Sequence, residues 1–309
     1  MRRILQGLIG LSLAIVPFPV SAPRTTEAEA YLRSAIELLK THHINRDSVD
    51  WGTVTAEADQ RIRNAVTTAD TYPAIRSILT SLGERHSFLV EPRQVAAPPT
   101  TSASQEALAS FPLPSGRYVD GGIGLIQVPQ LNTMRGDGEE RGRRYTAALR
   151  AALTTLDQGQ LCGWIIDLRR NSGGNMWPML QGLDPLLGEE PFGYFVRPSG
   201  VTVAWARTRT GIAGALPPLR GEGRSYSLAH QDAPIAVLIG PETGSSGEMT
   251  AIAFIGGPRV RTFGAPSAGL TNANSVYPLR DGAMLVITVT GGIVRGMWQG
   301  GELAASARE

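Results

Sequence analysis

Two short, almost purely apolar runs constrain the fold of this chain more than any other feature. They are Cys162-Gly-Trp-Ile-Ile-Asp-Leu168 and Ile235-Ala-Val-Leu-Ile-Gly240. Continuous apolar runs of this length are typical of strands buried on both faces, as in parallel sheets. Apolar residues spaced three and four apart predict a helix over 144–156, and a second helix is predicted to begin near Ser246. The alternation predicts an α/β fold with a mostly parallel sheet flanked by helices.

The remaining strands are predicted from local composition. Residues 122–129 have the composition of a strand, and two further strands are expected at about 275–279 and 284–290. Arg280-Asp281-Gly282 joins the last two, and Asp-Gly is a hairpin signal, so Asp281 is interpreted as a turn residue.

A small helical domain is expected ahead of the sheet. Apolar residues recur near helical spacing in three segments, which run from Thr26 to about Lys40, from Val54 to Ala69 and from Tyr72 to Leu82. An interval rich in Ala, Pro, Ser and Thr then lacks any periodicity. The predicted division is a helical domain at 23–95, a linker or loop at 96–118 and the α/β core at 119–309.

The N-terminus has the pattern of an export signal. Arg2 and Arg3 precede an apolar run from Leu8 to Val20, and Val20-Ser21-Ala22 has the small-x-small pattern of a cleavage site. An uncleaved membrane anchor is the alternative, but the run is shorter than the roughly 20 residues that a span requires, and prolines interrupt it. Residues 1–22 are therefore predicted to be a signal peptide, and the protein to be periplasmic or secreted by a bacterium.

Composition excludes several classes of function. A formal charge of +2 gives no reason to expect nucleic acid as a partner, and any membrane contact is expected only through an uncleaved signal sequence. Cys162 is the only cysteine, so no intramolecular disulfide can form. Lys40 is the only lysine, which limits the bases available to an enzyme.

Ser245 is a candidate nucleophile. It follows the second buried run and the turn Gly-Pro-Glu-Thr-Gly, and it precedes the predicted helix. Free N–H groups and the dipole at a helix N-terminus favour developing negative charge, as an acyl-transfer site requires. In the alternative interpretation, Ser245 or Ser246 is only an N-cap, with Glu248 completing a capping box.

A glycine turn after the first buried run strengthens the catalytic interpretation. The segment is Arg169-Arg-Asn-Ser-Gly-Gly174, and its glycines would let backbone amides approach a substrate carbonyl. A plain strand-to-helix turn is the alternative. If the two runs are adjacent parallel strands, both turns border the same crevice, where open α/β sheets bind ligands.

Several motifs in order resemble those of peptidase family S41, the tail-specific and C-terminal processing peptidases, which also include the tricorn core. The segments that carry the resemblance are Val49-Asp-Trp51, Leu82 to Leu89, Asp167 to Gly174, Gly244 to Glu248, Gly264 to Gly269 and Leu279 to Gly282. The resemblance implies a ClpP/crotonase-like core and a serine peptidase. It also implies Ser245 as the nucleophile and the backbone N–H groups of Gly173 and Ser246 as the oxyanion hole.

The general base departs from the usual pattern of the family. Many members use a lysine in a Gly-Lys-Gly segment, and the matching position here is Leu270. The tricorn-like branch uses a histidine from a segment before the sheet, and His86 stands where that branch places it. Since Lys40 lies in the predicted helical domain, the resemblance implies His86 as the base, and the pKa of histidine suits that role.

The third catalytic residue is less well defined by the sequence. The tricorn-like branch has a glutamate roughly sixty residues after the serine, and Glu302 lies nearest that position by the resemblance. Glu84 is either a local partner of His86 or solvated. His42 and His43 are predicted to be solvated at a helix end, and His230 to lie in a loop.

The expected substrate is a short peptide or an unfolded protein, and no metal or organic cofactor is expected. Family members usually carry a PDZ domain between helices and sheet, but the interval from Val95 to Asp120 is too short for one. The chain therefore resembles the branch without that domain, with endopeptidase or C-terminal processing activity. The alternative is a non-catalytic protein of this fold that binds a ligand or peptide. The sequence does not indicate an oligomeric state.

Overall fold

A computed structural model describes residues 26–95, 111–134, 137–208, 211–213, 226–257 and 259–293. The predicted signal peptide and Glu302 lie outside these residues. Within them, no helix is both long enough and apolar enough to cross a membrane.

A five-stranded sheet contains both buried apolar runs. Its strands, in spatial order, are β2 (Ser115–Val119), β3 (Ile123–Gln127), β4 (Gly163–Asp167), β8 (Ile235–Ile239) and β9 (Val260–Gly264). All neighbours are parallel except β2 and β3. The mixed, mostly parallel sheet is therefore confirmed, with the two runs as adjacent central strands.

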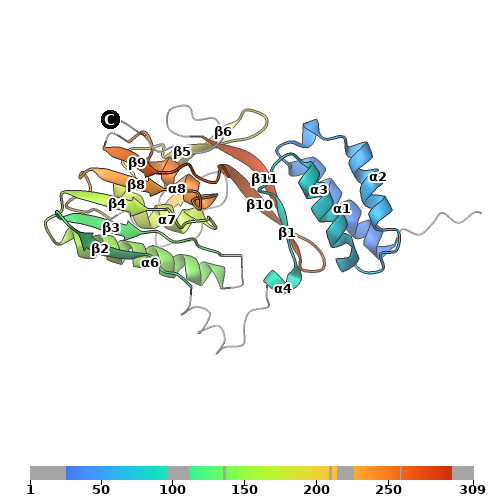
Figure 1. The fold of residues 1–309 in the computed structure, drawn as a ribbon, viewed down its shortest axis with the longest axis horizontal. Helices are drawn as coiled ribbons and strands as arrows, with labels where there is room; N and C mark the ends of the chain where they lie inside the picture. Colours follow the sequence, from blue (N-terminus) through green and yellow to red (C-terminus); the bar gives the residue numbers. More distant parts are fainter. Residues whose placement is uncertain are drawn as a thin grey trace, which may run out of the picture.

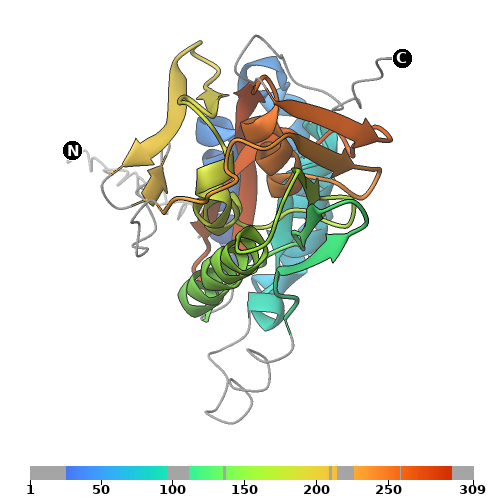
Figure 2. The same cartoon turned by 90° about the vertical axis from the view of Figure 1, so that its left-hand side faces the viewer.

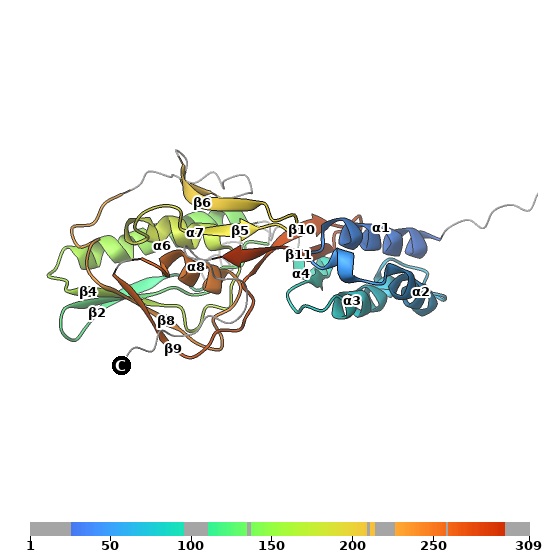
Figure 3. The same ribbon diagram turned by 90° about the horizontal axis from the view of Figure 1, so that it is seen from above.

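Three helices cover one face of this sheet (Figure 3): α6 (Gly138–Asp157), α7 (Met176–Leu183) and α8 (Ser246–Phe254). Every residue of α8 is buried. Side chains from all three helices join those of the sheet in one apolar core, and Leu149, Met179 and Ile252 in it are fully buried. This packing fixes the N-terminus of α8, and with it Ser245, above the carboxyl ends of the strands.

A second sheet was not predicted beyond its closing strand pair. It comprises β1 (Phe88–Val90), β5 (Gly193–Val196), β6 (Thr202–Thr208), β7 (Gly211–Ala213), β10 (Asn272–Pro278) and β11 (Met284–Ile293), all antiparallel. Strands β5 and β6 lie across the helices from the first sheet (Figure 2). Phe195 and Trp205 of these strands extend the same apolar core.

The N-terminal helices form a separate group at one end of the molecule (Figure 1). They are α1 (Glu27–His42), α2 (Trp51–Arg61) and α3 (Tyr72–Ser81), with short 3-10 turns at Arg46–Ser48 and Ala69–Thr71 and a short helix α4 at Pro92–Val95. Thr26 and Glu29 form a capping box at the start of α1.

The β10–β11 hairpin completes the apolar core of these helices. Leu279, Leu285 and Ile287 are buried among the side chains of α1 and α3. In the hairpin turn, Asp281 accepts hydrogen bonds from Tyr31 (2.7 Å) and Tyr72 (2.6 Å), so it is more than a turn residue. The helical group is thus built from both ends of the described chain. Because β1 and the hairpin are strands of the second sheet, they connect the helices to that sheet.

Candidate active site

The turns that follow β4 and β8 are bonded to each other. Because β4 and β8 are parallel neighbours, their carboxyl ends meet at one edge of the sheet. Gly244 N–H donates to the Asn171 carbonyl (3.0 Å), and the Ser246 hydroxyl donates to the Gly174 carbonyl (2.7 Å). The glycine turn and the serine turn therefore form one bonded unit at the edge of the sheet, where the sequence analysis expected both to border one crevice.

Ser245 occupies a strained position at the start of α8. Its φ is 51°, the only positive φ of a non-glycine residue in the described part of the chain. Such conformations cost about 1–3 kcal/mol and persist where surrounding contacts enforce them. Here the Ser245 N–H donates to the Glu248 carboxylate (2.8 Å), which is the glutamate half of the predicted capping box.

Glu248 is a fully buried carboxylate that links Ser245 to the segment before β10. It also accepts hydrogen bonds from the Ser267 hydroxyl and from the N–H groups of Gly269 and Leu270, both at 2.8 Å. Burial raises the pKa of Glu248, and these hydrogen bonds oppose that rise. Leu270, at the position of the family lysine, therefore lies beside the serine turn but brings no base.

Gly173 is packed against the serine. A Cβ at this position would come within 2.7 Å of the Ser245 Cβ, and its φ is +115°, so only glycine fits. Its N–H donates to the Asn171 side-chain oxygen (3.0 Å). The Ser246 N–H, by contrast, donates to no described residue. The two predicted oxyanion donors thus flank Ser245, but one is already occupied in this state.

His86 and Ser245 are in direct contact although they are far apart in sequence. The His86 Nε2 lies 2.9 Å from the Ser245 Oγ, within the range for proton transfer. The hydroxyl of Ser245 is therefore hydrogen-bonded to the His86 imidazole, and it also lies at the start of α8. His86 itself is 7% exposed.

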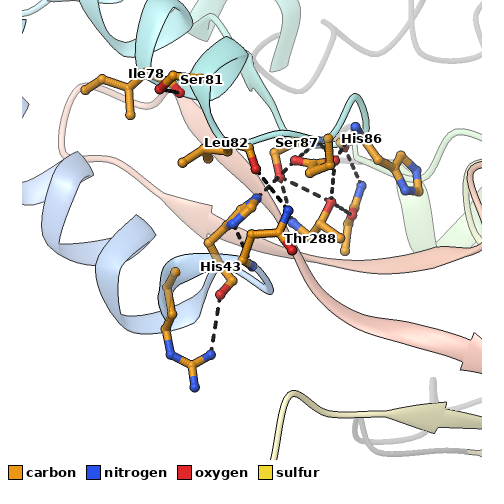
Figure 4. A network of polar contacts seen from close by, with 11 residues as sticks. His43, Ile78, Ser81, Leu82, His86, Ser87 and Thr288 are labelled. Carbon is orange, nitrogen blue, oxygen red and sulfur yellow. Dashed lines mark hydrogen bonds and ion pairs between the residues drawn. The ribbon is translucent and has the colours of Figure 1, made fainter. Parts of the chain in front are cut away.

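The backbone of His86 is held from both sides (Figure 4). Its N–H donates to the Glu84 carboxylate, and its carbonyl accepts from the Asn274 amide (2.9 Å). Thr288 on β11 donates its hydroxyl to the Asn274 oxygen (2.9 Å). These contacts connect the loop before β1 to the β10–β11 hairpin, and so position the imidazole.

Glu84 and His43 form a buried pair beneath that loop, and the expectation that His43 is solvated is wrong. His43 is fully buried, its Nε2 lies 3.1 Å from Glu84 Oε1, and its Nδ1 accepts from the Asn45 N–H (3.0 Å). Burial would raise the pKa of Glu84, but hydrogen bonds from His43, Ser87 and the His86 backbone hold it at about 2. Glu84 is thus a local partner of His86 through the backbone, and it is charged.

The other imidazole nitrogen of His86 lacks a partner. Its Nδ1 is buried and makes no hydrogen bond with any residue that the structure describes. Burial lowers the pKa of His86, while the charge of Glu84 and the backbone carbonyl of Asn272 oppose that effect. The imidazole is therefore held predominantly neutral near pH 7, the form that a base requires.

The remaining candidates lie away from this contact or outside the described residues. Lys40 pairs with Glu37 on α1 (3.4 Å), His42 stacks on Tyr277, and His230 bonds to Asp157 (2.9 Å). Glu302 is among the residues that the structure does not describe. Within the described ranges, no group of three His, Cys, Asp or Glu side chains could hold a metal ion.

An open pocket of about 500 Å³ adjoins the serine turn. It is lined by Pro112, Pro129, Gln130, Arg170, Ser172, Pro241, Glu242, Gly244, Ala268 and Leu270. Most of this lining is apolar, and Arg170 and Glu242 are its two charged residues. A pocket beside a hydrogen-bonded serine and histidine can hold a substrate side chain or chain end.

Comparison with known proteins identifies the relatives of this arrangement. The model of peptidase family S41 matches residues 122–295. The nisin-resistance protein of Lactococcus lactis subsp. lactis is 28% identical over 262 residues, which cover 84% of this chain and 76% of that protein. The chloroplastic carboxyl-terminal-processing peptidase 2 of Arabidopsis thaliana is 28% identical over 172 residues, 54% of this chain but 27% of its own length.

The fold also occurs in solved structures of other proteins. A lipoprotein from Streptococcus agalactiae has a TM-score of 0.71 at 21% identity, with 95% of this chain and 93% of that chain covered. The photosystem II D1 C-terminal processing protease has a TM-score of 0.59 at 14% identity, covering 91% and 93%. At these identities the likeness establishes the architecture.

Proposed function

The chain belongs to peptidase family S41, and on that premise we propose that it hydrolyses peptide bonds as a serine peptidase. In this proposal Ser245 is the nucleophile and His86 is the general base. The observation that carries it is the 2.9 Å contact between His86 Nε2 and Ser245 Oγ.

The proposed reaction follows the usual acyl-transfer sequence. His86 Nε2 accepts the hydroxyl proton as Ser245 Oγ attacks the scissile carbonyl, and the imidazolium then protonates the leaving amine. Water hydrolyses the acyl-enzyme with the same base. For Nε2 to accept, the neutral ring must carry its proton on Nδ1, which makes no hydrogen bond with a described residue. A carboxylate from Glu302 is the partner that we propose for that proton.

The negative charge of the tetrahedral intermediate needs two donors. We propose the Ser246 N–H, which has no partner among the described residues, and the Gly173 N–H. The Gly173 N–H donates to the Asn171 side chain in this structure. To bind the substrate oxygen, it must break that hydrogen bond and turn toward the substrate. Such contacts often form only when substrate binds.

The proposed substrates are short peptides or unfolded proteins outside the cytoplasm. The predicted signal peptide at residues 1–22 supports a periplasmic or secreted enzyme. The predicted lack of a PDZ domain favours recognition by the cleft itself, as an endopeptidase or a C-terminal processing enzyme. Nisin belongs among the peptides to be tested, because one relative is a nisin-resistance protein.

A peptide library tests the proposal. The mature protein is incubated with the library beside Ser245→Ala and His86→Ala variants, and cleavage is read by mass spectrometry. Each variant is expected to lose activity by about a thousandfold or more, since nucleophile and base act as a unit. Equal turnover by all three proteins would overturn the assignment.

The second candidate is a non-catalytic protein that binds a peptide or another ligand with the same fold. The observation that favours it is that His86 Nδ1 makes no hydrogen bond with a described residue, since an imidazole without a hydrogen-bonded acceptor is a poorly oriented base. Wild-type protein that binds library peptides without cleaving them would support this alternative.

A further inference from the structure

Two adjacent arginines follow β4, and they are in different electrostatic situations. The Arg169 guanidinium makes two hydrogen bonds to the Asp167 carboxylate, at 2.9 and 2.8 Å. Arg170 is exposed and makes no ion pair or hydrogen bond with any residue in the described ranges. Arg169 thus has a partner within the protein, whereas the charge of Arg170 is free to take an external one.

Arg170 lines the pocket beside the serine turn. Gly244 in the same lining directly precedes Ser245, and Leu270, which also lines the pocket, shares the Glu248 carboxylate with the Ser245 N–H. Because Leu270 of the pocket and Ser245 are bonded to one buried carboxylate, the pocket keeps a fixed relation to the nucleophile. A group bound there lies close to the scissile bond.

The lining indicates what kind of group fits. Pro129, Pro241, Ala268 and Leu270 offer apolar contact, and the guanidinium of Arg170 offers paired N–H donors. Those donors match the two oxygens of a carboxylate. An exposed pair of this kind is weak in water, but a peptide that covers the pocket excludes water and strengthens it.

We infer that Arg170 binds a carboxylate of the substrate peptide in this pocket, so that peptides with a carboxylate near the scissile bond are preferred. The inference rests on the proposed peptidase function and names a recognition group for it. The carboxylate is either the C-terminal α-carboxylate or the side chain of Asp or Glu.

Glu242 provides a matched control in the same pocket. It carries the opposite charge and makes no ion pair with Arg170. Its carboxylate repels a substrate carboxylate rather than binding it. Glu242→Gln is therefore expected to keep the preference for a carboxylate, whereas Arg170→Gln is expected to remove it.

The experiment compares two pairs of peptides that share one sequence cleaved by the wild type near its C-terminus. The first pair differs in a free carboxylate or an amide at the C-terminus. The second pair differs in Asp or Asn within the residues next to the scissile bond. These pairs distinguish the two sources of the carboxylate.

In one of the two pairs, the peptide with the carboxylate is expected to have a kcat/KM about tenfold higher than its uncharged counterpart. This holds for the wild type and for Glu242→Gln, and a charge-assisted hydrogen bond accounts for a difference of that size. Arg170→Gln is expected to treat both forms alike. A wild type without preference in either pair, or an Arg170→Gln variant that keeps it, would overturn the inference.

Binding separates this inference from the proposed activity. The dissociation constants of the same peptides are measured by calorimetry on Ser245→Ala, with and without Arg170→Gln. A preference that depends on Arg170 without any wild-type turnover would sink the peptidase proposal and leave the carboxylate site standing. Wild-type turnover without such a preference would support the peptidase proposal and overturn the inference about Arg170.

Discussion

At the scale of single residues, the position of His86 depends on contacts to its backbone. Its N–H is bonded to Glu84 and its carbonyl to Asn274, whereas its Nδ1 is without a described partner. Glu84 is in turn bonded to the buried His43. We therefore propose Glu84 as a positioning residue that acts through the backbone.

Glu84→Gln tests that role. Loss of the charged acceptor should shift the His86 loop and lower kcat by about tenfold to a hundredfold, with a smaller effect on KM. Because the Glu84 charge raises the His86 pKa, the acid limb of the kcat/KM profile should also move to lower pH. The control is Glu91→Gln. Glu91 directly follows β1 and pairs with Arg76 on α3. An unmoved acid limb would contradict the proposed coupling.

The wild-type pH profile tests the state of the imidazole itself. Only neutral His86 can accept a proton, and burial lowers its pKa below the ordinary 6.5. Activity should therefore be full at neutral pH and fall as the pH drops through a midpoint below 6.5. The measurement is kcat/KM against pH, which reports the free enzyme. A midpoint well above 6.5 would show that another group, or a differently placed imidazole, limits the reaction.

At the scale of elements, the β10–β11 hairpin connects the helices to the loop of His86. Its turn docks on α1 and α3 through Asp281, and its strands carry Asn274 and Thr288 to the loop of His86. Burial and hydrogen bonding to Asp281 raise the pKa of Tyr72 to about 12 and also raise that of Tyr31, so both tyrosine partners of Asp281 are neutral donors.

Asp281→Ala should loosen this docking. Two part-buried hydroxyl groups lose their acceptor, which costs about 2 kcal/mol. For a chain of this length the melting temperature should fall by roughly 3 °C, and activity should fall with it. Calorimetry measures the first effect and peptide turnover the second. Asp47→Ala, at a side chain 81% exposed, is the control, and equal melting temperatures for the two variants would contradict the docking role.

At the scale of the whole molecule, two apolar cores meet at the second sheet. One core lies between the five-stranded sheet and its helices, and the other joins α1 and α3 to the hairpin. The proposed nucleophile, Ser245, belongs to the first core, and the proposed base, His86, lies on a loop fixed by the second. The proposed activity therefore requires both cores to be intact.

Leu285→Ala tests this arrangement. Leu285 is fully buried in the second core, and its truncation should cost roughly 2–5 kcal/mol. Hydrogen exchange should show larger losses of protection in α1 and α3 than in β4 and β8, together with reduced turnover. Uniform loss across all these elements would indicate a single cooperative core instead.

The sequence predicted those features that depend on local pattern. The buried strands, the helix after Ser245 and the Asp-Gly hairpin each follow from a few neighbouring residues. It missed β5 to β7, of which β5 and β7 have only four and three residues, too few to show a clear periodicity. It placed His43 in solvent because its partner, Glu84, is 41 residues away, and only tertiary folding reveals that pair.

Labelling with a fluorophosphonate probe tests the central claim most directly, because the probe reacts only with an activated hydroxyl. Mass spectrometry then locates the adduct. The account predicts an adduct on Ser245 in the wild type and little or none in His86→Ala. An unlabelled folded wild type, an adduct on another residue, or equal labelling of the two proteins would contradict it.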